Sequence, residues 1–453
     1  MAVRFVIIGG GPAGTQAATH GARLGAEVTV IERDVVGGAA HLWDCIPSKA
    51  MIATGDALRD IARASGMGLT QVRADLDFQA LKLRNASIEG RLESSNRTLL
   101  ESQGVRMLKG TGRLTGPNTV VADTADGPVE LAADAILLSS GSRPRIPDFA
   151  QPDGVRVLTT RDAYPPPTMP THLVVIGSGV TGVEFVHMFS AFGCEVTLIV
   201  SRQQVLPQKD PEVAAVLEDE FLRRGVRLLK GARAEGIDVE GDVVTVRCDD
   251  GRTAVGSHAL LAIGAVPNSD ELGLDLAGVE VDRGGYIPIN QHCVTNVSHI
   301  YAAGDLSGKL PLSSVASMQG RKVAEHVMGG HTRAHRHLDY DKAASAIFTD
   351  PEIADVGLAE ADAFAEGRKI RVTKVPFSAS AKALINDDPR GFVKILSDPA
   401  TGVVLGGSIV GRHAAELISV IALAVTAGLR VNDIVESLLV HPALSEALAE
   451  AAE

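Results

Sequence analysis

Residues 4–33, RFVIIGGGPAGTQAATHGARLGAEVTVIER, decide how the first part of the chain folds. The apolar run Phe5–Ile8 predicts a strand, and a helix and a second strand follow it. Glycines at the GxGxxG spacing and an acid after the second strand complete the pattern, at Gly9, Gly11, Gly14 and Glu32. Such glycines permit a tight turn and let a pyrophosphate approach the helix N-terminus, while the acid accepts hydrogen bonds from a ribose. The stretch therefore predicts a βαβ unit that binds a dinucleotide.

The same pattern returns at residues 172–202, HLVVIGSGVTGVEFVHMFSAFGCEVTLIVSR. Its glycines are Gly177, Gly179 and Gly182. Here the second strand ends in Ser201 and Arg202, with no carboxylate at the place that Glu32 has in the first copy. An acid there would repel a 2′-phosphate, whereas a serine and an arginine can receive one. We therefore expect NADPH at this second site, and NADH, with Arg202 as a solvated surface charge, is the open alternative.

Length and composition indicate a globular protein of about three domains. The 453 residues are 45% hydrophobic, and the formal net charge is −12. An acidic chain without basic runs is a poor partner for nucleic acid, and no apolar run reaches the roughly 18 residues that a membrane span needs. The N-terminus enters the first strand at once and leaves no room for a targeting segment, so we expect a cytoplasmic protein.

The four cysteines lie far apart, with no CxxC and no Cys/His cluster. This spacing indicates neither a disulfide framework nor a metal site. Cys194, Cys248 and Cys293 fall in or next to strand-like segments, so we interpret them as small packing residues.

Two dinucleotide-binding units in one chain suggest a tightly held flavin and an exchanging nicotinamide, a pairing typical of hydride transfer. Further motifs extend the pattern along nearly the whole chain. They are LLSSGSRPRIP at 137–147, LLAIGAVPNS at 260–269, IYAAGDLSG at 300–308, AIFTDPEIADVGLAE at 346–360, GFVKILSDPATGVVLGGSIVG at 391–411 and HPALSEAL at 441–448. In this order they resemble the pyridine nucleotide disulfide oxidoreductase family of flavoproteins, which includes dihydrolipoamide dehydrogenase and glutathione reductase.

The resemblance implies an α/β fold with two Rossmann-like domains, for FAD and for NAD(P), and a C-terminal α+β dimerisation domain. The domains are expected at 1–147 for FAD, 148–265 for NAD(P), 266–335 for a return segment of the FAD domain and 336–453 for dimerisation. The protein is accordingly expected to be a homodimer that uses FAD and NADPH or NADH.

The resemblance also implies roles for single residues. Asp305 matches an aspartate that binds the ribityl chain of FAD, and Gly141 lies in one of the two crossover segments that close the nucleotide domains. Lys49 matches a lysine near flavin N5, and Glu184 matches its carboxylate partner. A cation beside N5 stabilises negative charge on the reduced ring.

The C-terminal motif resembles the catalytic end of the family. His441 and Glu446 match an acid–base dyad in which the glutamate orients the imidazole, and the family supplies that histidine from the other subunit. Two interpretations stay open: the dyad protonates the oxygen of the electron acceptor, or it is a relic that packs at the dimer interface.

Residues 37–50, GGAAHLWDCIPSKA, depart from the family where its redox disulfide lies. In redox members a cysteine, four residues and a second cysteine precede IPSK. Cys45 matches the second cysteine, and Ala40 stands in place of the first, so the disulfide cannot form. Trp43 is either a helix-packing residue or a wall of the acceptor pocket. Cys45 is a flavin-adjacent thiolate that tunes the ring, an inert buried thiol, or a sole redox cysteine.

Without a dithiol relay, electrons must leave the flavin directly. The sequence is most similar to the branch of the family that has GGAA in place of the first cysteine and reduces quinones, so we expect an NAD(P)H:quinone oxidoreductase. The alternatives are a soluble pyridine nucleotide transhydrogenase, a dihydrolipoamide dehydrogenase-like protein with a single redox cysteine, and a flavin-loaded binding protein with negligible turnover. Ala40 argues against the second, because that reaction needs both thiols.

Overall fold

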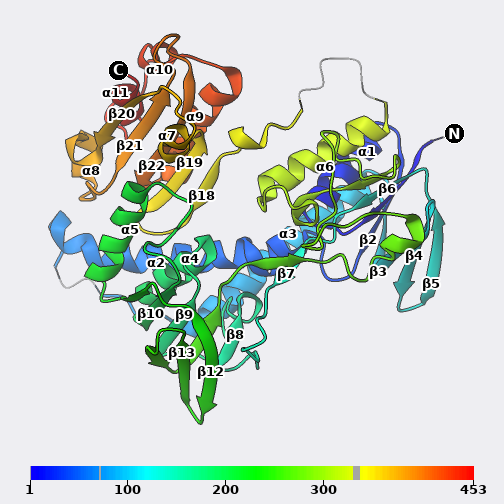
Figure 1. The fold of residues 1–453 in the computed structure, drawn as a ribbon, viewed down its shortest axis with the longest axis horizontal. Coiled ribbons are helices and arrows are strands. Elements are labelled where there is room, and N and C mark those ends of the chain that lie inside the picture. The colour runs from blue at the N-terminus through cyan, green and yellow to red at the C-terminus, as the bar shows by residue number, and fades with distance from the viewer. Residues whose placement is uncertain (1, 71–72, 330–336) are drawn as a thin grey trace. The chain divides into compact units, whose positions relative to one another are not determined.

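The computed structural model describes residues 2–70, 73–329 and 337–453 (Figure 1). These residues form two compact units, each assembled from segments far apart in the chain. The segments are Met1–Ser48, Gln79–Arg145 and Ala265–Tyr340 in the first unit, and Lys49–Phe78, Ile146–Gly264 and Asp341–Glu453 in the second. The boundary expected between residues 335 and 336 lies outside the described residues.

A seven-stranded sheet forms the centre of the first unit, in the order β17-β6-β1-β2-β3-β4-β5. Neighbouring strands are parallel from β17 to β3 and antiparallel from β3 to β5. The strands are β17 (Ile300–Ala302), β6 (Ala135–Leu138), β1 (Arg4–Ile8), β2 (Glu27–Glu32), β3 (Arg106–Gly116), β4 (Thr119–Thr124) and β5 (Gly127–Ala132). Helix α1 (Pro12–Arg23) joins β1 to β2, which confirms the βαβ unit predicted for residues 4–33.

Both faces of this sheet are covered, as the continuous apolar run in β1 requires. Alternate side chains of a strand point to opposite faces. Phe5 and Ile7 pack in one buried cluster, and Val6 and Ile8 pack in another. Helices α1 and α6 (Ser313–Val327) lie side by side in Figure 1. A Cβ on Gly320 of α6 would lie 2.0 Å from the carbonyl oxygen of Ala13, so the two helices can approach this closely only with a glycine there.

The second unit repeats the pattern with a five-stranded parallel sheet in the order β11-β10-β9-β15-β8. The strands are β11 (Arg227–Lys230), β10 (Glu195–Val200), β9 (His172–Ile176), β15 (His258–Leu261) and β8 (Val157–Thr159). Helix α4 (Val180–Ala191) joins β9 to β10 and confirms the βαβ unit predicted for residues 172–202. An antiparallel sheet of β12 (Ala234–Glu240), β13 (Val243–Cys248) and β14 (Thr253–Gly256) adjoins it in sequence.

The two stretches interpreted as crossover segments pair with each other. In the first unit, β7 (Ser142–Pro144) runs antiparallel to β16 (Ala265–Pro267). The side chain of Asn268 donates to the carbonyl oxygen of Ser140 at 2.9 Å and extends this pairing.

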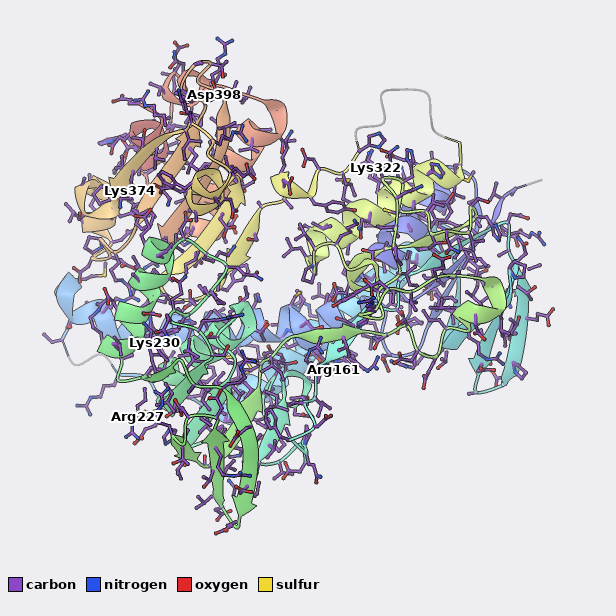
Figure 2. All side chains as sticks on the ribbon, viewed as in Figure 1. Arg161, Arg227, Lys230, Lys322, Lys374 and Asp398 are labelled. Carbon is purple, nitrogen blue, oxygen red and sulfur yellow. The ribbon has the colours of Figure 1, made fainter. Side chains whose placement is uncertain are left out.

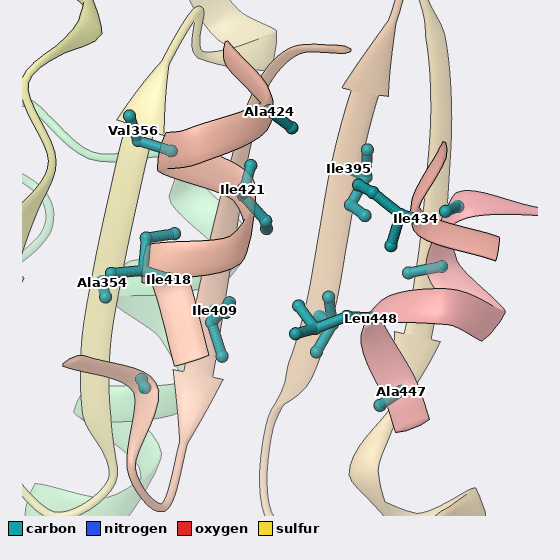
Figure 3. Close-up of a cluster of buried hydrophobic side chains, with 14 of the residues drawn as sticks. Ala354, Val356, Ile395, Ile409, Ile418, Ile421, Ala424, Ile434, Ala447 and Leu448 are labelled. Atoms are coloured by element: carbon teal, nitrogen blue, oxygen red, sulfur yellow. The ribbon is translucent and has the colours of Figure 1, made fainter. Parts of the chain in front are cut away.

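An antiparallel sheet, in the order β18-β19-β22-β21-β20, forms the C-terminal part of the second unit. Its strands are β18 (Ser345–Ile347), β19 (Glu352–Gly357), β22 (Val404–Gly411), β21 (Phe392–Ser397) and β20 (Arg371–Pro376), and its helices include α9 (Ala414–Ala427), α10 (Val431–Val435) and α11 (Glu446–Ala452). Figure 3 shows Ile418 and Ile421 of α9 beside Ala354 and Val356 of β19, in one buried cluster. This antiparallel sheet with its helices is the C-terminal α+β domain that the sequence predicted beside the two Rossmann-like domains.

Ion pairs bind this C-terminal sheet to α5 (Pro211–Arg223) within the second unit. Lys394 of β21 has a side chain that is 1% exposed, and its Nζ lies 2.7 Å from Asp210 and 2.5 Å from Glu212. Lys374 of β20, labelled in Figure 2, also pairs with Glu212, at 2.7 Å. Burying an ammonium group costs free energy unless the group is paired. The carboxylates of Asp210 and Glu212 offset this cost for Lys394.

Candidate active site

The glycines of the first fingerprint leave no room for side chains where the chain turns. A Cβ on Gly14 would lie 1.9 Å from the carbonyl oxygen of Gly9, and a Cβ on Gly9 would lie 2.3 Å from that of Ser139. Gly11 is different, because its Cβ position has no described atom within 4 Å. Gly11 caps the N-terminus of α1, which carries a partial positive charge. The turn is therefore closed on the protein side and accessible on the side where an anionic group would bind.

Glu32 is fixed at the end of β2 by two backbone amides. Its Oε2 accepts a hydrogen bond from the amide of Gly10 at 2.7 Å, and its Oε1 accepts one from the amide of Asp34 at 2.6 Å. Burial raises the pKa of Glu32, and these two hydrogen bonds oppose that rise. The carboxylate is thus held beside the glycine turn, as the sequence predicts for a ribose-binding acid.

A pocket of about 320 Å³ lies at the N-terminal ends of α1 and α6. Its wall consists of Pro12, Thr15, Gln16, Gly37, Ala40, His41, Cys45, Ile46, Asn96, Ser313, Ser314 and Ser317. Sites for small molecules and cofactors have volumes of roughly 300–1,000 Å³. Two helix N-termini, hydroxyl groups and amide groups suit an anionic group, so the pocket fits a group such as the diphosphate that links the two halves of FAD.

Cys45 lies in this pocket at the end of a π-helical turn, Ala40–Asp44. Its Sγ is 3.4 Å from the Oγ of Ser313, at the start of α6. None of the four cysteines, all of which lie in the described part of the chain, forms a disulfide. Turns of this π-helical type are frequent at functional sites, and here Ala40 and His41 of the turn line the pocket together with Cys45.

The other three cysteines are buried, as expected of packing residues. Burial raises the pKa of Cys194 and of Cys293 to about 12, and it also raises that of Cys248. Such thiols stay protonated and unreactive near neutral pH.

Asp305 lies in a short helical turn, Gly304–Ser307, directly after β17. The hydroxyl of Ser142 donates to its Oδ2 at 2.6 Å. Gly141, the residue before Ser142, has a φ of +70°, which favours glycine. The structure therefore brings two of the predicted site residues, Asp305 and Gly141, to neighbouring positions of the first unit.

Lys49 and Glu184 form an ion pair in the second unit. The Nζ of Lys49, in α2 (Ile46–Arg63), donates to the Oε2 of Glu184 at 2.9 Å. The side chain of Glu184 is 6% exposed, and its Oε1 accepts a hydrogen bond from the amide of Phe348 at 3.0 Å. Lys49 Nζ also lies 4.9 Å from the centroid of the Phe348 ring. The carboxylate and the ring together fix the position of the ammonium group.

The second fingerprint has the same closed turn as the first. A Cβ on Gly182 would lie 1.9 Å from the carbonyl oxygen of Gly177, and Gly179 caps α4 with no described atom within 4 Å of its Cβ position. Ser201 and Arg202 are exposed after the end of β10. The backbone of Arg202 is anchored, because its carbonyl accepts a hydrogen bond from the amide of Gly231 at 3.0 Å.

His441 and Glu446 lie close together near the C-terminus. His441 Nδ1 is 2.7 Å from Glu446 Oε1, and Glu446 Oε2 accepts a hydrogen bond from the amide of Ala443 at 2.8 Å. The hydrogen bond from Ala443, and then that from His441, lower the pKa of Glu446. The imidazole is 74% exposed, so a carboxylate orients it while its other nitrogen remains accessible.

Sequence reasoning missed three residues of these sites. His41 lies within residues 37–50, yet only the folded structure shows that it lines the pocket. Ser313 lies outside the quoted motifs and contacts Cys45 from a distant part of the sequence. Phe348 lies in the motif at 346–360, but nothing in that motif indicates its contact with Glu184.

Comparisons with known proteins agree with the resemblance found in the sequence. A family model described as pyridine nucleotide-disulphide oxidoreductase matches residues 3–320, and the model of that family's dimerisation domain matches residues 343–452. The NAD(P)H dehydrogenase (quinone) of Mycobacterium tuberculosis is 41% identical, over 100% of this chain and 94% of the relative. The dihydrolipoyl dehydrogenase of Zymomonas mobilis is 34% identical, over 98% of this chain and 96% of the relative.

Solved structures show the same relationship. The crystal structure of LpdA from Mycobacterium tuberculosis superposes with a TM-score of 0.94 at 40% identity, over 100% of this chain and 99% of that chain. The HOCl-induced flavoprotein disulfide reductase RclA from Escherichia coli, at 24% identity and a TM-score of 0.88, shares the fold. Among the helices of the described ranges, none is long and apolar enough to cross a membrane.

The family match implies FAD and NAD(P)H as cofactors, and it places a dimerisation domain at the C-terminal end. The fingerprint geometry and the family comparisons lead to the same conclusion: this chain belongs to the pyridine nucleotide-disulphide oxidoreductase family and is a flavin-dependent NAD(P)H oxidoreductase.

Proposed function

We propose that the protein is an FAD-dependent NAD(P)H:quinone oxidoreductase with no dithiol relay. FAD supplies a flavin that accepts a hydride at N5 from the nicotinamide and delivers electrons to a quinone. The observation that carries the proposal is Ala40, which stands on the pocket wall beside Cys45 where thiol exchange would need a second sulfur. A relative at 41% identity is named NAD(P)H dehydrogenase (quinone), which supports the same acceptor class.

In this proposal the first fingerprint holds FAD. Gly9 and Gly14 shape the turn, Gly11 lets the diphosphate approach the N-terminus of α1, and Glu32 accepts hydrogen bonds from a ribose. Asp305 accepts from the ribityl hydroxyls in the way that it accepts from Ser142. Gly141, in the first crossover segment, has a positive φ and lets the backbone turn just before Ser142, which donates to this carboxylate.

Lys49 is the residue that we assign to flavin N5. Glu184 and the Phe348 ring hold its ammonium group in one place. A fixed positive charge stabilises negative charge that develops in the transition state, because it needs no reorganisation during the reaction.

The second fingerprint binds the exchanging coenzyme in the same scheme. Gly177, Gly179 and Gly182 form its turn. Ser201 and Arg202 are exposed at the end of β10, where they can receive a 2′-phosphate, so NADPH is the proposed coenzyme. NADH would contact the same glycine turn, but it has no 2′-phosphate and would lack the contact with Ser201 and Arg202.

His441 and Glu446 act in the proposed homodimer, in which each histidine serves the partner's site. Leu438 and Val440, just before His441, are exposed apolar side chains of the dimerisation domain. Large exposed apolar side chains that occur together are typical of an interface. The imidazole, oriented by Glu446, would donate a proton to the quinone oxygen as charge arrives there.

The decisive experiment compares steady-state NADPH oxidation by wild type and Cys45→Ala with menadione and with lipoamide as acceptors. We expect menadione turnover to survive the substitution and lipoamide to remain unreduced by both proteins. Cys194→Ala is the matched control, because it removes a buried thiol outside the pocket. Loss of menadione turnover in Cys45→Ala alone, or lipoamide reduction by wild type, would refute the proposal.

A transhydrogenase is the competing enzyme, and the same assay can reveal it. The protein would then transfer hydride from NADPH to an NAD analogue as fast as it reduces menadione. We expect that transfer to be slow in the absence of quinone.

A further inference from the structure

The pocket at the first fingerprint has an unusual electrostatic composition. Among the described residues on its wall, none is Asp, Glu, Lys or Arg. The wall residues from α1, α3 (Phe78–Ser102) and α6 are uncharged: Pro12, Thr15, Gln16, Asn96, Ser313, Ser314 and Ser317. The titratable side chains on the wall are His41 and Cys45, and only His41 can become positive.

The His41 ring is packed against the turn that touches the first fingerprint. A Cβ on Gly37 would lie 1.9 Å from His41 Nδ1, so the ring lies directly on the Gly37 backbone. Gly37 donates its amide to the carbonyl oxygen of Gly10 at 2.8 Å. A Cβ on the next residue, Gly38, would lie 2.8 Å from the Cα of Gly11. The imidazole therefore packs on the Gly37–Gly38 segment, and that segment in turn contacts Gly10 and Gly11 of the first fingerprint.

A side-chain amide from α3 approaches the same ring nitrogen. Asn96 Nδ2 lies 3.4 Å from His41 Nδ1. Burial lowers the pKa of His41, and a hydrogen bond with the backbone of Val36 opposes that shift. A half-buried imidazole of this kind is neutral near pH 7 until an anion approaches it.

We infer that His41 is a pH-dependent binding residue for FAD, in which the imidazolium serves as the counter-charge of the cofactor's diphosphate. The inference rests on FAD as the cofactor of this pocket. Each phosphate of FAD is negative throughout the working pH range, and the helix N-terminus supplies only a partial positive charge. A side chain that takes up a proton when the diphosphate enters completes the neutralisation.

The sign of the pH dependence follows from linkage. An anion beside His41 raises the pKa of the imidazole, so binding is accompanied by proton uptake. FAD affinity is highest below the pKa of the free protein, falls as pH rises, and levels off above the pKa of the complex. A rise of about one pKa unit on binding corresponds to about tenfold in affinity.

Two other titrating groups of this site have distinguishable effects. Glu32 accepts from Gly10, and protonation of Glu32 would weaken FAD binding as pH falls, which is the opposite direction. Ionisation of Cys45 would weaken it as pH rises, in the same direction as His41, so this thiol needs its own control.

The test measures FAD binding to apoprotein by quenching of flavin fluorescence between about pH 5.5 and 8, where histidines titrate. We expect the affinity of wild type to fall about tenfold over this range and that of His41→Gln to stay level at the high-pH value of wild type. Cys45→Ser should keep the decline. So should His20→Gln, because His20 has a pKa that is also lowered by burial but lies outside the pocket wall.

Parallel pH profiles for wild type and His41→Gln would overturn the inference while leaving FAD as the cofactor. Failure of wild type to bind FAD at any pH would instead overturn the proposed function together with it. If His41→Gln does not fold, calorimetry of wild type in two buffers of different ionisation enthalpy decides the matter. Proton uptake on FAD binding near pH 6.5 is expected, and its absence would overturn the inference.

Discussion

The two glycine fingerprints of this chain have the same turn and different ends. In each, a Cβ on the third glycine would lie 1.9 Å from the carbonyl oxygen of the first, so both turns exclude every residue except glycine. The difference lies after the second strand, where Glu32 is held by two backbone amides and its counterparts Ser201 and Arg202 are exposed. The glycines thus determine the βαβ geometry in both units, whereas the proposed difference in nucleotide depends on the residues at the strand end.

The largest expected effect comes from replacing the third glycine of one fingerprint at a time with alanine. Gly14→Ala places a methyl group against the carbonyl of Gly9, so we expect FAD binding to weaken at least about a hundredfold and the flavin to be lost on purification. Gly182→Ala should leave the flavin bound and abolish its reduction by NADPH. Flavin absorbance and anaerobic reduction measure the two effects.

Gly90→Ala is the control for both variants. Gly90 lies inside α3 with no described atom within 4 Å of its Cβ position, so alanine should raise stability by about 0.5–1 kcal/mol and change neither nucleotide site. If Gly14→Ala and Gly182→Ala lost the same function, the assignment of one nucleotide to each fingerprint would be wrong.

A smaller effect is expected from Glu32→Gln. The substitution removes a charged acceptor at the end of β2, which costs about 2 kcal/mol, or about thirtyfold in FAD affinity. Because burial raises the pKa of Glu32, affinity in wild type should also fall at acid pH as this carboxyl is protonated. Fluorescence titration with FAD measures both, and the KM for NADPH should not change. A variant with unaltered FAD affinity would contradict the ribose assignment.

The smallest effect in the series is expected from Arg202→Glu. Arg202 is exposed, so its attraction to a 2′-phosphate is screened and contributes about 1.4 kcal/mol, or about tenfold in KM for NADPH. The kcat should persist, and the KM for NADH should stay level or fall. Arg227→Glu, at an exposed arginine of β11 that is labelled in Figure 2, is the matched charge control. Equal KM changes for both coenzymes would show that Arg202 is a solvated surface charge.

Local patterns account for what the sequence could predict. Both βαβ units follow from glycine spacing beside apolar strands, and the loss of the disulfide follows from one alanine five residues before Cys45. The His441–Glu446 contact is likewise local, because only five residues separate the two side chains. Patterns of this kind lie within a single stretch of chain.

Contacts between distant stretches could not be predicted in this way. The Lys49–Glu184 pair spans 135 positions and was expected only from the family resemblance. Ser313 reaches Cys45 across 268 positions, and no periodicity or motif encodes that distance. The role of His41 depends on what surrounds it, an uncharged pocket wall that three helices provide, and composition alone does not reveal such an environment.

The central claim is that reducing power passes from the flavin without a thiol relay, and an anaerobic reductive titration tests it most directly. Flavin and disulfide each take up an electron pair, so an enzyme with a redox disulfide stores about four electrons per flavin and one without it stores about two. We predict complete bleaching of the purified protein with about two electron equivalents per FAD, in wild type and in Cys45→Ala alike. Uptake of about four by wild type, falling to about two in Cys45→Ala, would contradict the account.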